Sequence, residues 1–201
     1  MFATATRLDQ AGPITPEFLA RIVAPYKPTQ TDYLKAARMI QRFDPDEDEP
    51  DDKASLTPII TTVGRFEIPH SCYIQSTGHF NAVEYLICFN QLAYTTVGHL
   101  VATGMLAELP LHRVSAACRQ EAERVTIARF FDKQLSSMLI LKTETRFTKV
   151  IDASDFQGEL KVQSLFYRRG TLFGQLECTF TDAKGGHSEG SVLLAYPLNF
   201  N

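Results

Sequence analysis

One segment of the chain places small, polar and titratable residues directly before a long apolar run. The run begins at Tyr85, and the segment before it is Ser76-Thr77-Gly78-His79-Phe80-Asn81-Ala82-Val83-Glu84. The run is apolar on nearly every side of a helix, and such a helix must be buried. Its first turn presents unpaired backbone N–H groups and the positive end of the helix dipole. The pattern therefore predicts a site that polarises a carbonyl group and moves a proton.

Two titratable side chains stand in this segment. His79 is of the residue type best suited to act as a general base near neutral pH. Glu84, buried if the run is a helix, is a second group for proton transfer, and its alternative role is a structural hydrogen bond. Residues five apart share a helical face poorly, so we expect the two groups to act separately.

The composition predicts one globular domain over residues 1–201, with an acidic loop or insert at about residues 44–53. Asp44–Asp52 holds seven acidic residues, and without them 20 basic residues face 16 acidic ones. The body is thus mildly basic, which fits either an anionic ligand such as a phosphorylated carrier or ordinary surface scatter. The small net charge of −3 argues against a nucleic-acid-binding protein.

The cysteines and the apolar run bear on the cellular compartment. Without a metal-ligand spacing, the cysteines indicate a reducing cytoplasm, and three of them are expected to be buried: Cys72, Cys88 and Cys178, with Cys118 the fourth. The stretch from Tyr85 to Ala107 is long enough to cross a bilayer. Its polar interior positions and the lack of flanking Lys or Arg clusters favour a buried helix and no membrane contact.

The other elements follow from periodicity and turn residues. Thr15–Val23 predicts a capped helix and Cys118–Leu135 a second amphipathic one. Strands are expected at 32–43 and 58–68, and then at 137–150, 158–167, 171–181 and 188–196. The short links between the last four strands predict an antiparallel meander.

An apolar sheet face needs a cover, and an apolar helix needs a wrapper. The economical arrangement is an α+β hot-dog fold, in which a curled antiparallel sheet wraps one long central helix. Fold alone leaves the function open.

Three blocks of sequence resemble the FcoT family of hot-dog acyl-thioester enzymes. The longest is Ser71–Glu84 with Cys88–Tyr94 beyond it. The second is Gln134–Ile140 with basic residues downstream, and the third is Pro25-Tyr26. Together they cover most of the chain from Thr15 onward, and the acidic run has no counterpart in the family pattern.

The resemblance implies two activities. Some members are long-chain fatty acyl-CoA thioesterases, and others add glycine across the double bond of an α,β-unsaturated acyl thioester and then hydrolyse the thioester. It also implies functional roles for Tyr26, Tyr73 and Asn81. On sequence alone packing is the better explanation for the two tyrosines, and Asn81 is either a donor to substrate or a helix cap.

Glycine as a co-substrate requires a cation for its carboxylate. Lys142 and Arg146 lie four apart in an expected strand and so share a face. An outward strand face or a site for carrier phosphates is the competing explanation. Ser137 is expected to line the pocket, without a nucleophile motif around it. No cofactor and no metal site is predicted.

The predicted enzyme thus adds glycine to an enoyl thioester on acyl carrier protein or CoA and hydrolyses the product. His79 is the base, and Tyr73, Asn81 and backbone N–H groups polarise the carbonyl. Tyr26 and Glu84 are further catalytic candidates, and the substrate contacts are Ser76, Thr77, Gly78, Phe80, Val83, Ser137, Lys142 and Arg146. The alternatives are a plain thioesterase, a hydratase or dehydratase, and a non-catalytic acyl-chain binder. A homodimer is expected by analogy with the fold.

Overall fold

The computed structural model describes residues 12–41, 60–72, 79–108, 120 and 122–197. Its strands form one antiparallel sheet in the order β1-β2-β3-β5-β6-β7-β4. The strands are β1 (Gly12–Pro13), β2 (Leu34–Gln41), β3 (Ile60–Phe66), β4 (Leu139–Lys149), β5 (Phe156–Arg168), β6 (Thr171–Thr181) and β7 (His187–Pro197). The acidic run and Cys118 lie outside the described residues.

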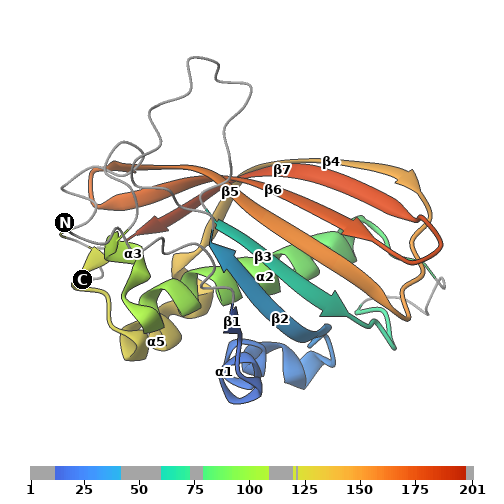
Figure 1. The fold of residues 1–201 in the computed structure, drawn as a ribbon, viewed down its shortest axis with the longest axis horizontal. Coiled ribbons are helices and arrows are strands. Elements are labelled where there is room, and N and C mark those ends of the chain that lie inside the picture. The colour runs from blue at the N-terminus through green and yellow to red at the C-terminus, as the bar shows by residue number, and fades with distance from the viewer. Residues whose placement is uncertain (1–11, 42–59, 73–78, 109–119, 121, 198–201) are drawn as a thin grey trace, which may run out of the picture.

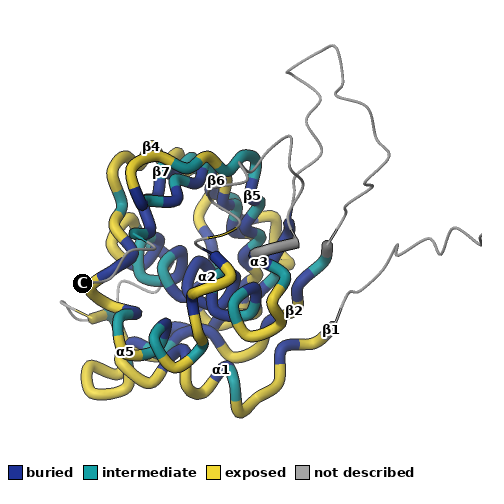
Figure 2. Tube along the Cα trace, turned by 90° about the vertical axis from the view of Figure 1, so that its left-hand side faces the viewer, coloured by how far each residue is buried: buried dark blue, intermediate teal, exposed yellow. Residues whose placement is uncertain are grey.

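The sheet curls around a single long helix, α2 (Ala82–Thr103) (Figure 1). The end-on view in Figure 2 shows the buried α2 inside the curve of the sheet. Shorter helices flank it: α1 (Pro16–Ile22), η1 (Ala24–Thr29), α3 (Met105–Glu108) and α5 (Ile127–Ser137). The α+β hot-dog fold expected from the sequence is therefore confirmed.

Local signals in the sequence set the helix ends. The Thr15 hydroxyl accepts a hydrogen bond from the backbone of Phe18 at the start of α1, as the Thr-Pro pair predicts. Gly104 ends α2 with a φ of 74°, in the left-handed region that favours glycine. The Thr126 side chain caps α5, so this helix begins later than the predicted Cys118.

One expectation about the sheet is wrong. The predicted meander of four strands holds only for β5, β6 and β7, because β4 pairs with β7 and β5 pairs with β3. Residues 150–155, which connect β4 to β5, do not form a tight turn between paired strands. The backbone of Phe80 donates to the carbonyl of Ile151 in this link, which carries the chain past the start of α2. As a result β4 is an edge of the sheet.

The core is apolar and aromatic. Rings of Phe66, Phe80, Tyr85, Phe156 and Phe180 pack between the first half of α2 and the sheet, with neighbouring centroids 4.9–6.2 Å apart. We call this set the aromatic cluster.

The free thiols Cys88 and Cys178 are buried as expected, whereas Cys72 is exposed because it lies in the loop after β3. Within the described part of the chain, none of the helices is both long enough and apolar enough to cross a membrane.

Candidate active site

The first turn of α2 is held by a reciprocal capping box. The side-chain oxygen of Asn81 accepts hydrogen bonds from the N–H groups of Val83 at 3.0 Å and Glu84 at 3.3 Å. The carboxylate of Glu84 accepts from the N–H of Asn81 at 3.2 Å. This arrangement satisfies the backbone donors that a helix start otherwise leaves unpaired.

The capping box changes which groups remain to bind an oxyanion. The N–H groups of Asn81, Val83 and Glu84 bond within the box, and the N–H of Phe80 bonds to Ile151. Of the N–H groups between Gly78 and Asn81 that are expected to hold the oxyanion, those of Phe80 and Asn81 are therefore already bonded, and Gly78 lies outside the described residues. Outside these bonds lie the amide nitrogen of Asn81 and the N–H of Ala82.

His79 lies two residues before Asn81 and is exposed on the surface of the single chain. Its backbone forms an isolated antiparallel bridge with Asp152. The Asp152 carboxylate in turn accepts hydrogen bonds from Ser154 and forms an ion pair with Lys184 at 2.5 Å, and this keeps its pKa well below the usual range. The loop that carries Asp152 thus fixes the backbone before α2, and with it the position of His79.

Glu84 is only 2% exposed. Burial raises the pKa of the Tyr33 phenol, and the nearby charges of Cys72 and Glu84 raise it further. The Tyr33 hydroxyl donates to the carbonyl of His70 at 2.9 Å. Glu84 therefore lies beside a tyrosine that stays protonated, with its own carboxylate committed to the capping box.

Tyr26 lies in η1, half-buried against α2, with its ring centroid 6.5 Å from that of Tyr94. Burial is the main cause that raises the pKa of its phenol, so the group remains an O–H donor at any physiological pH. It is therefore no candidate for the base. The structure brings Tyr26 to the same helix as Asn81, further along its length.

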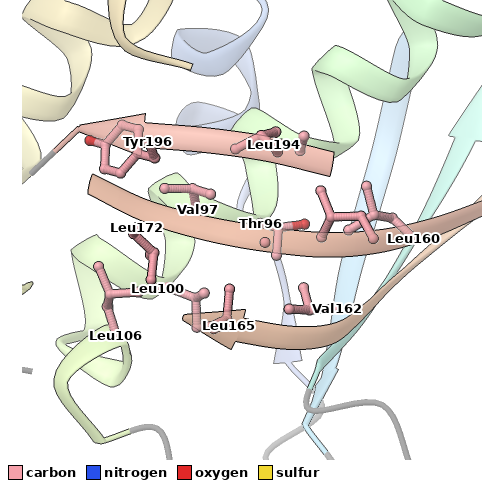
Figure 3. A pocket seen from close by; sticks show the side chains of 13 residues that line it. Thr96, Val97, Leu100, Leu106, Leu160, Val162, Leu165, Leu172, Leu194 and Tyr196 are labelled. Carbon is pink, nitrogen blue, oxygen red and sulfur yellow. The ribbon is translucent and has the colours of Figure 1, made fainter. Parts of the chain in front are cut away.

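A small apolar cavity of about 40 Å³ lies beside the second half of α2 (Figure 3). Leu106 of α3 and inward-facing side chains of three strands converge on it, and Thr96 is its polar wall residue from the helix. The Thr96 hydroxyl donates to the carbonyl of Leu92 and bonds to Thr62, so the cavity offers hydrocarbon surface only. Its lining residues are Ala93, Thr96, Val97, Leu100, Leu106, Leu160, Val162, Leu165, Leu172, Gly174, Leu176, Leu194 and Tyr196.

The remaining predicted site residues are scattered. Phe80 is buried in the aromatic cluster, and Val83 is 42% exposed on the first turn. Ser137 is buried at the end of α5, which packs on the second half of α2 through Phe130 and Gly98. Tyr73, Ser76, Thr77 and Gly78 lie outside the described residues.

Lys142 and Arg146 do share one face of β4, as their spacing predicts. They stand opposite Leu193 and Glu189 of β7, whose neighbours Val192, Leu194 and Ser188 face inward. The two cations therefore face outward, and the sheet separates them from α2 within one chain. Lys142 pairs with Glu144 at 2.8 Å, as on an ordinary solvated surface.

Two features escaped the sequence reasoning. The pairing of Asn81 with Glu84 three residues later is a readable capping signal, and it assigns Glu84 a structural bond. The cavity beside Gly174 has no such signal, because it depends on which strands become neighbours. Among the described residues, no group of three or more His, Cys, Asp or Glu side chains is placed to hold a metal ion.

Comparison with known proteins adds independent findings. The family model of the FcoT-like thioesterase domain matches residues 21–196. Relatives named (2E)-enoyl-[ACP] glycyltransferase include two proteins from Mycobacterium species and one from a Streptomyces species. The Mycobacterium marinum protein is 32% identical over 185 residues, covering 90% of this chain and 86% of the relative. The Mycobacterium tuberculosis protein is 33% identical over 186 residues, with 91% and 87% covered. The Streptomyces coeruleorubidus protein is 30% identical over 183 residues, with 89% and 94% covered.

Proposed function

Because the chain belongs to the FcoT-like thioesterase family, we propose that it adds glycine to an α,β-unsaturated acyl thioester and then hydrolyses the thioester. The observation that carries this proposal is the match of about nine-tenths of the chain to proteins named enoyl glycyltransferases. The product is an N-carboxymethyl-3-amino fatty acid. The carrier of the acyl group is acyl carrier protein or CoA, and the free thiols support a cytoplasmic location.

The first step is a conjugate addition. The amine nitrogen of glycine attacks the β-carbon, the C=C electrons move to the α-carbon, and the thioester oxygen becomes an enolate. Before the attack His79 accepts a proton from the glycine ammonium, which frees the amine, and afterwards the protonated His79 returns that proton to the α-carbon. Water next attacks the carbonyl and the thiolate leaves. Both steps place negative charge on the same oxygen.

The amide group of Asn81 is the donor we propose for that oxygen. Its Oδ1 is held by two backbone N–H groups, so the Nδ2 group points away from the helix. A donor fixed before the reaction begins is worth about 3–4 kcal/mol of barrier in enzymes of this kind. Glu84 holds the Asn81 backbone, Tyr73 is a further donor, and Ser76, Thr77, Gly78 and Val83 contact the substrate. Tyr26, whose ring lies beside Tyr94 further along α2, would contact the substrate away from the reacting oxygen. The outward Lys142 and Arg146 are not part of this site within one chain.

A second copy of the chain is proposed to complete the site. All of β4 except Ile140 is exposed, so the sheet presents an open edge of 11 residues. Open edges of this length are normally paired or covered. The inward-facing Phe147 of β4 contacts both Phe80 and Tyr85, which places this edge beside the start of α2. A partner strand there would cover the exposed first turn.

The test is a product assay with a trans-2-enoyl pantetheine thioester and ¹⁵N-glycine, followed by mass spectrometry. We expect a labelled glycine adduct released as the free acid, and no adduct with His79→Ala. A plain thioesterase, favoured by the family description, would release unlabelled acid from saturated and unsaturated substrates alike. Addition of water with glycine ignored would identify a hydratase, and binding without turnover a non-catalytic protein.

A further inference from the structure

The aromatic cluster and the cavity divide the interior of the sheet into two halves. Gly158 of β5 and Gly190 of β7 face inward beside the first half of α2. Gly174 of β6 faces inward beside the second half. All three are glycines at inward positions of adjacent strands. The three glycines differ in the atoms that lie above them. This difference shows which part of the interior is unfilled.

Rings and hydroxyls fill the space over two of these glycines. A Cβ at Gly158 would lie 2.5 Å from Cε1 of Phe180, and a Cβ at Gly190 would lie 2.5 Å from the Tyr85 hydroxyl. At Gly174 the nearest atom is Cδ2 of Leu165 at 3.3 Å, followed by two atoms of Leu176 at 3.9 Å. Its φ is not in the left-handed region. Gly174 therefore accepts a side chain, and that side chain would enter the cavity.

A stripe of mostly apolar residues on α2, with Asn90 as its polar member, leads from the candidate active site to this cavity. Val83, Leu86, Asn90, Val97 and Val101 recur at intervals of three, four and seven, so they share one side of the helix. All five are half-buried or exposed, in contrast to the fully buried face at Tyr85 and Phe89. Val97 also lines the cavity. The stripe thus bypasses the aromatic cluster.

The length of the stripe sets a scale for a hydrocarbon chain laid along it. Val83 and Val97 are 14 positions apart, which is about 21 Å at the helical rise of 1.5 Å per residue. An extended hydrocarbon advances about 1.3 Å per carbon, given C–C bonds of about 1.5 Å. An acyl chain whose carbonyl lies at the first turn therefore needs about 16 carbons to reach the cavity.

We infer that Gly174 determines the upper chain length of the acyl substrate, because its missing side chain leaves the cavity open for the last carbons of a long chain. This inference rests on the proposed function, since it takes the thioester to lie at the start of α2. The cavity is small enough for one branched side chain at position 174 to remove most of its space.

The experiment compares wild type with Gly174→Leu on trans-2-enoyl pantetheine thioesters of about eight and about 16 carbons, the length that the stripe requires. A few lost methylene contacts in an apolar pocket are worth at least tenfold in kcat/KM, so we expect about that loss for the long substrate. The short substrate, which does not reach the cavity, is expected to keep its rate. Leu165→Ala, which enlarges the cavity, is expected to favour still longer chains.

The matched control is Gln175→Leu, the same residue introduced one position later on the outward face of β6. It is expected to leave both substrates unaffected. Thermal unfolding of each variant separates a folding defect from a change of preference, and the milder Gly174→Ala serves if the leucine variant does not fold. Equal losses on both chain lengths, or none on the long one, would overturn the inference.

Binding of palmitate and octanoate, measured by calorimetry, distinguishes this inference from the proposed function. If wild type forms no glycine adduct yet Gly174→Leu selectively weakens palmitate binding, the proposed reaction fails and the role of Gly174 stands. If the adduct forms but neither assay responds selectively to Gly174→Leu, the reaction stands and the role of Gly174 fails.

Discussion

Asn81 carries two functional atoms with separate duties. Its Oδ1 caps α2 by accepting from Val83 and Glu84, while its Nδ2 lies outside those bonds. Capping residues are exchangeable as long as an acceptor remains at the right place, whereas donation to a substrate requires the amide. The two duties can therefore be separated by substitution.

We predict that Asn81→Ser leaves the protein as stable as wild type and lowers kcat by about 10²–10³, because a serine caps as well as asparagine but lacks the amide donor. Urea unfolding and turnover of an enoyl thioester measure the two effects.

Asn81→Ala is the control for the cap, and it should also cost about 1 kcal/mol of stability. Glu84→Gln keeps an acceptor for the N–H of Asn81 and is expected to retain most turnover. Full activity in Asn81→Ser would show that this amide does not contact the reacting oxygen.

At the scale of elements, α2 is anchored by polar side chains as well as by its apolar faces. Gln91 is fully buried, and its side chain accepts from the N–H of Leu34 at 2.8 Å and donates to the carbonyl of Thr31 at 2.6 Å. These bonds satisfy two backbone groups where β2 begins beside the helix. They fix the position of α2 along its axis relative to β2.

We predict that Gln91→Leu destabilises the fold by about 2–5 kcal/mol, since two buried backbone groups would lose their partners. Urea unfolding measures this loss. Gln175→Leu on the outward face of β6 is the comparison, and it should change the unfolding free energy little. Similar values for both variants would mean that water replaces the side chain at Thr31 and Leu34.

His99 links α2 to α1 and gives this contact a pH dependence. Its ring meets the ring of Phe18 edge-on at 6.1 Å, and burial lowers its pKa below the usual value. The folded chain thus favours the neutral imidazole. The stabilisation is complete above the unfolded pKa of about 6.5 and is lost as the pH falls below it.

We predict that between about pH 8 and pH 5.5, on either side of that unfolded pKa, wild type loses more stability than His99→Phe, which keeps a ring against Phe18. The measurement is the urea midpoint of both proteins at each pH. Parallel losses in the two proteins would assign the pH dependence to other groups.

Periodicity and capping residues were enough to predict α1, α2, α5 and the strands from β2 to β7, but not the short elements β1, η1 and α3. The apolar faces of α2 and the alternation in β5–β7 follow directly from the sequence, and so does the wrapped helix. The position of β4 does not, since chain order and short links favour a meander, while Phe80 and Ile151 bond across the link. For the same reason the sequence showed that Lys142 and Arg146 share a face but not which face.

At the scale of the whole molecule, the open edge of β4 is the main surface without a described partner strand. Exposed apolar side chains accompany it, among them Leu139 and Leu141. Charged residues, above all lysine, are the usual means of keeping such an edge from pairing. The outward face carries Lys142, Glu144 and Arg146 in alternating sign, which suits pairing with an identical antiparallel strand.

We predict that wild type is a dimer in solution and that Leu141→Lys makes it a monomer with reduced turnover. Light scattering coupled to size-exclusion chromatography gives the mass. Phe166→Lys replaces an equally exposed apolar residue far from this edge, on β5, and should leave the dimer intact. A monomeric wild type with full activity would remove the partner from the proposed site.

The placement of β4 also constrains how the polypeptide matures on the ribosome. This strand emerges before β5, β6 and β7, yet its hydrogen-bonding neighbour is β7, the last strand to be synthesised. Until β7 is synthesised, β4 is a strand without its hydrogen-bonding partner. Unpaired strands of this kind are prone to aggregate and are bound by chaperones. Pairing of β4 with a second copy in its folded geometry therefore requires that β7 has first joined the sheet beside it.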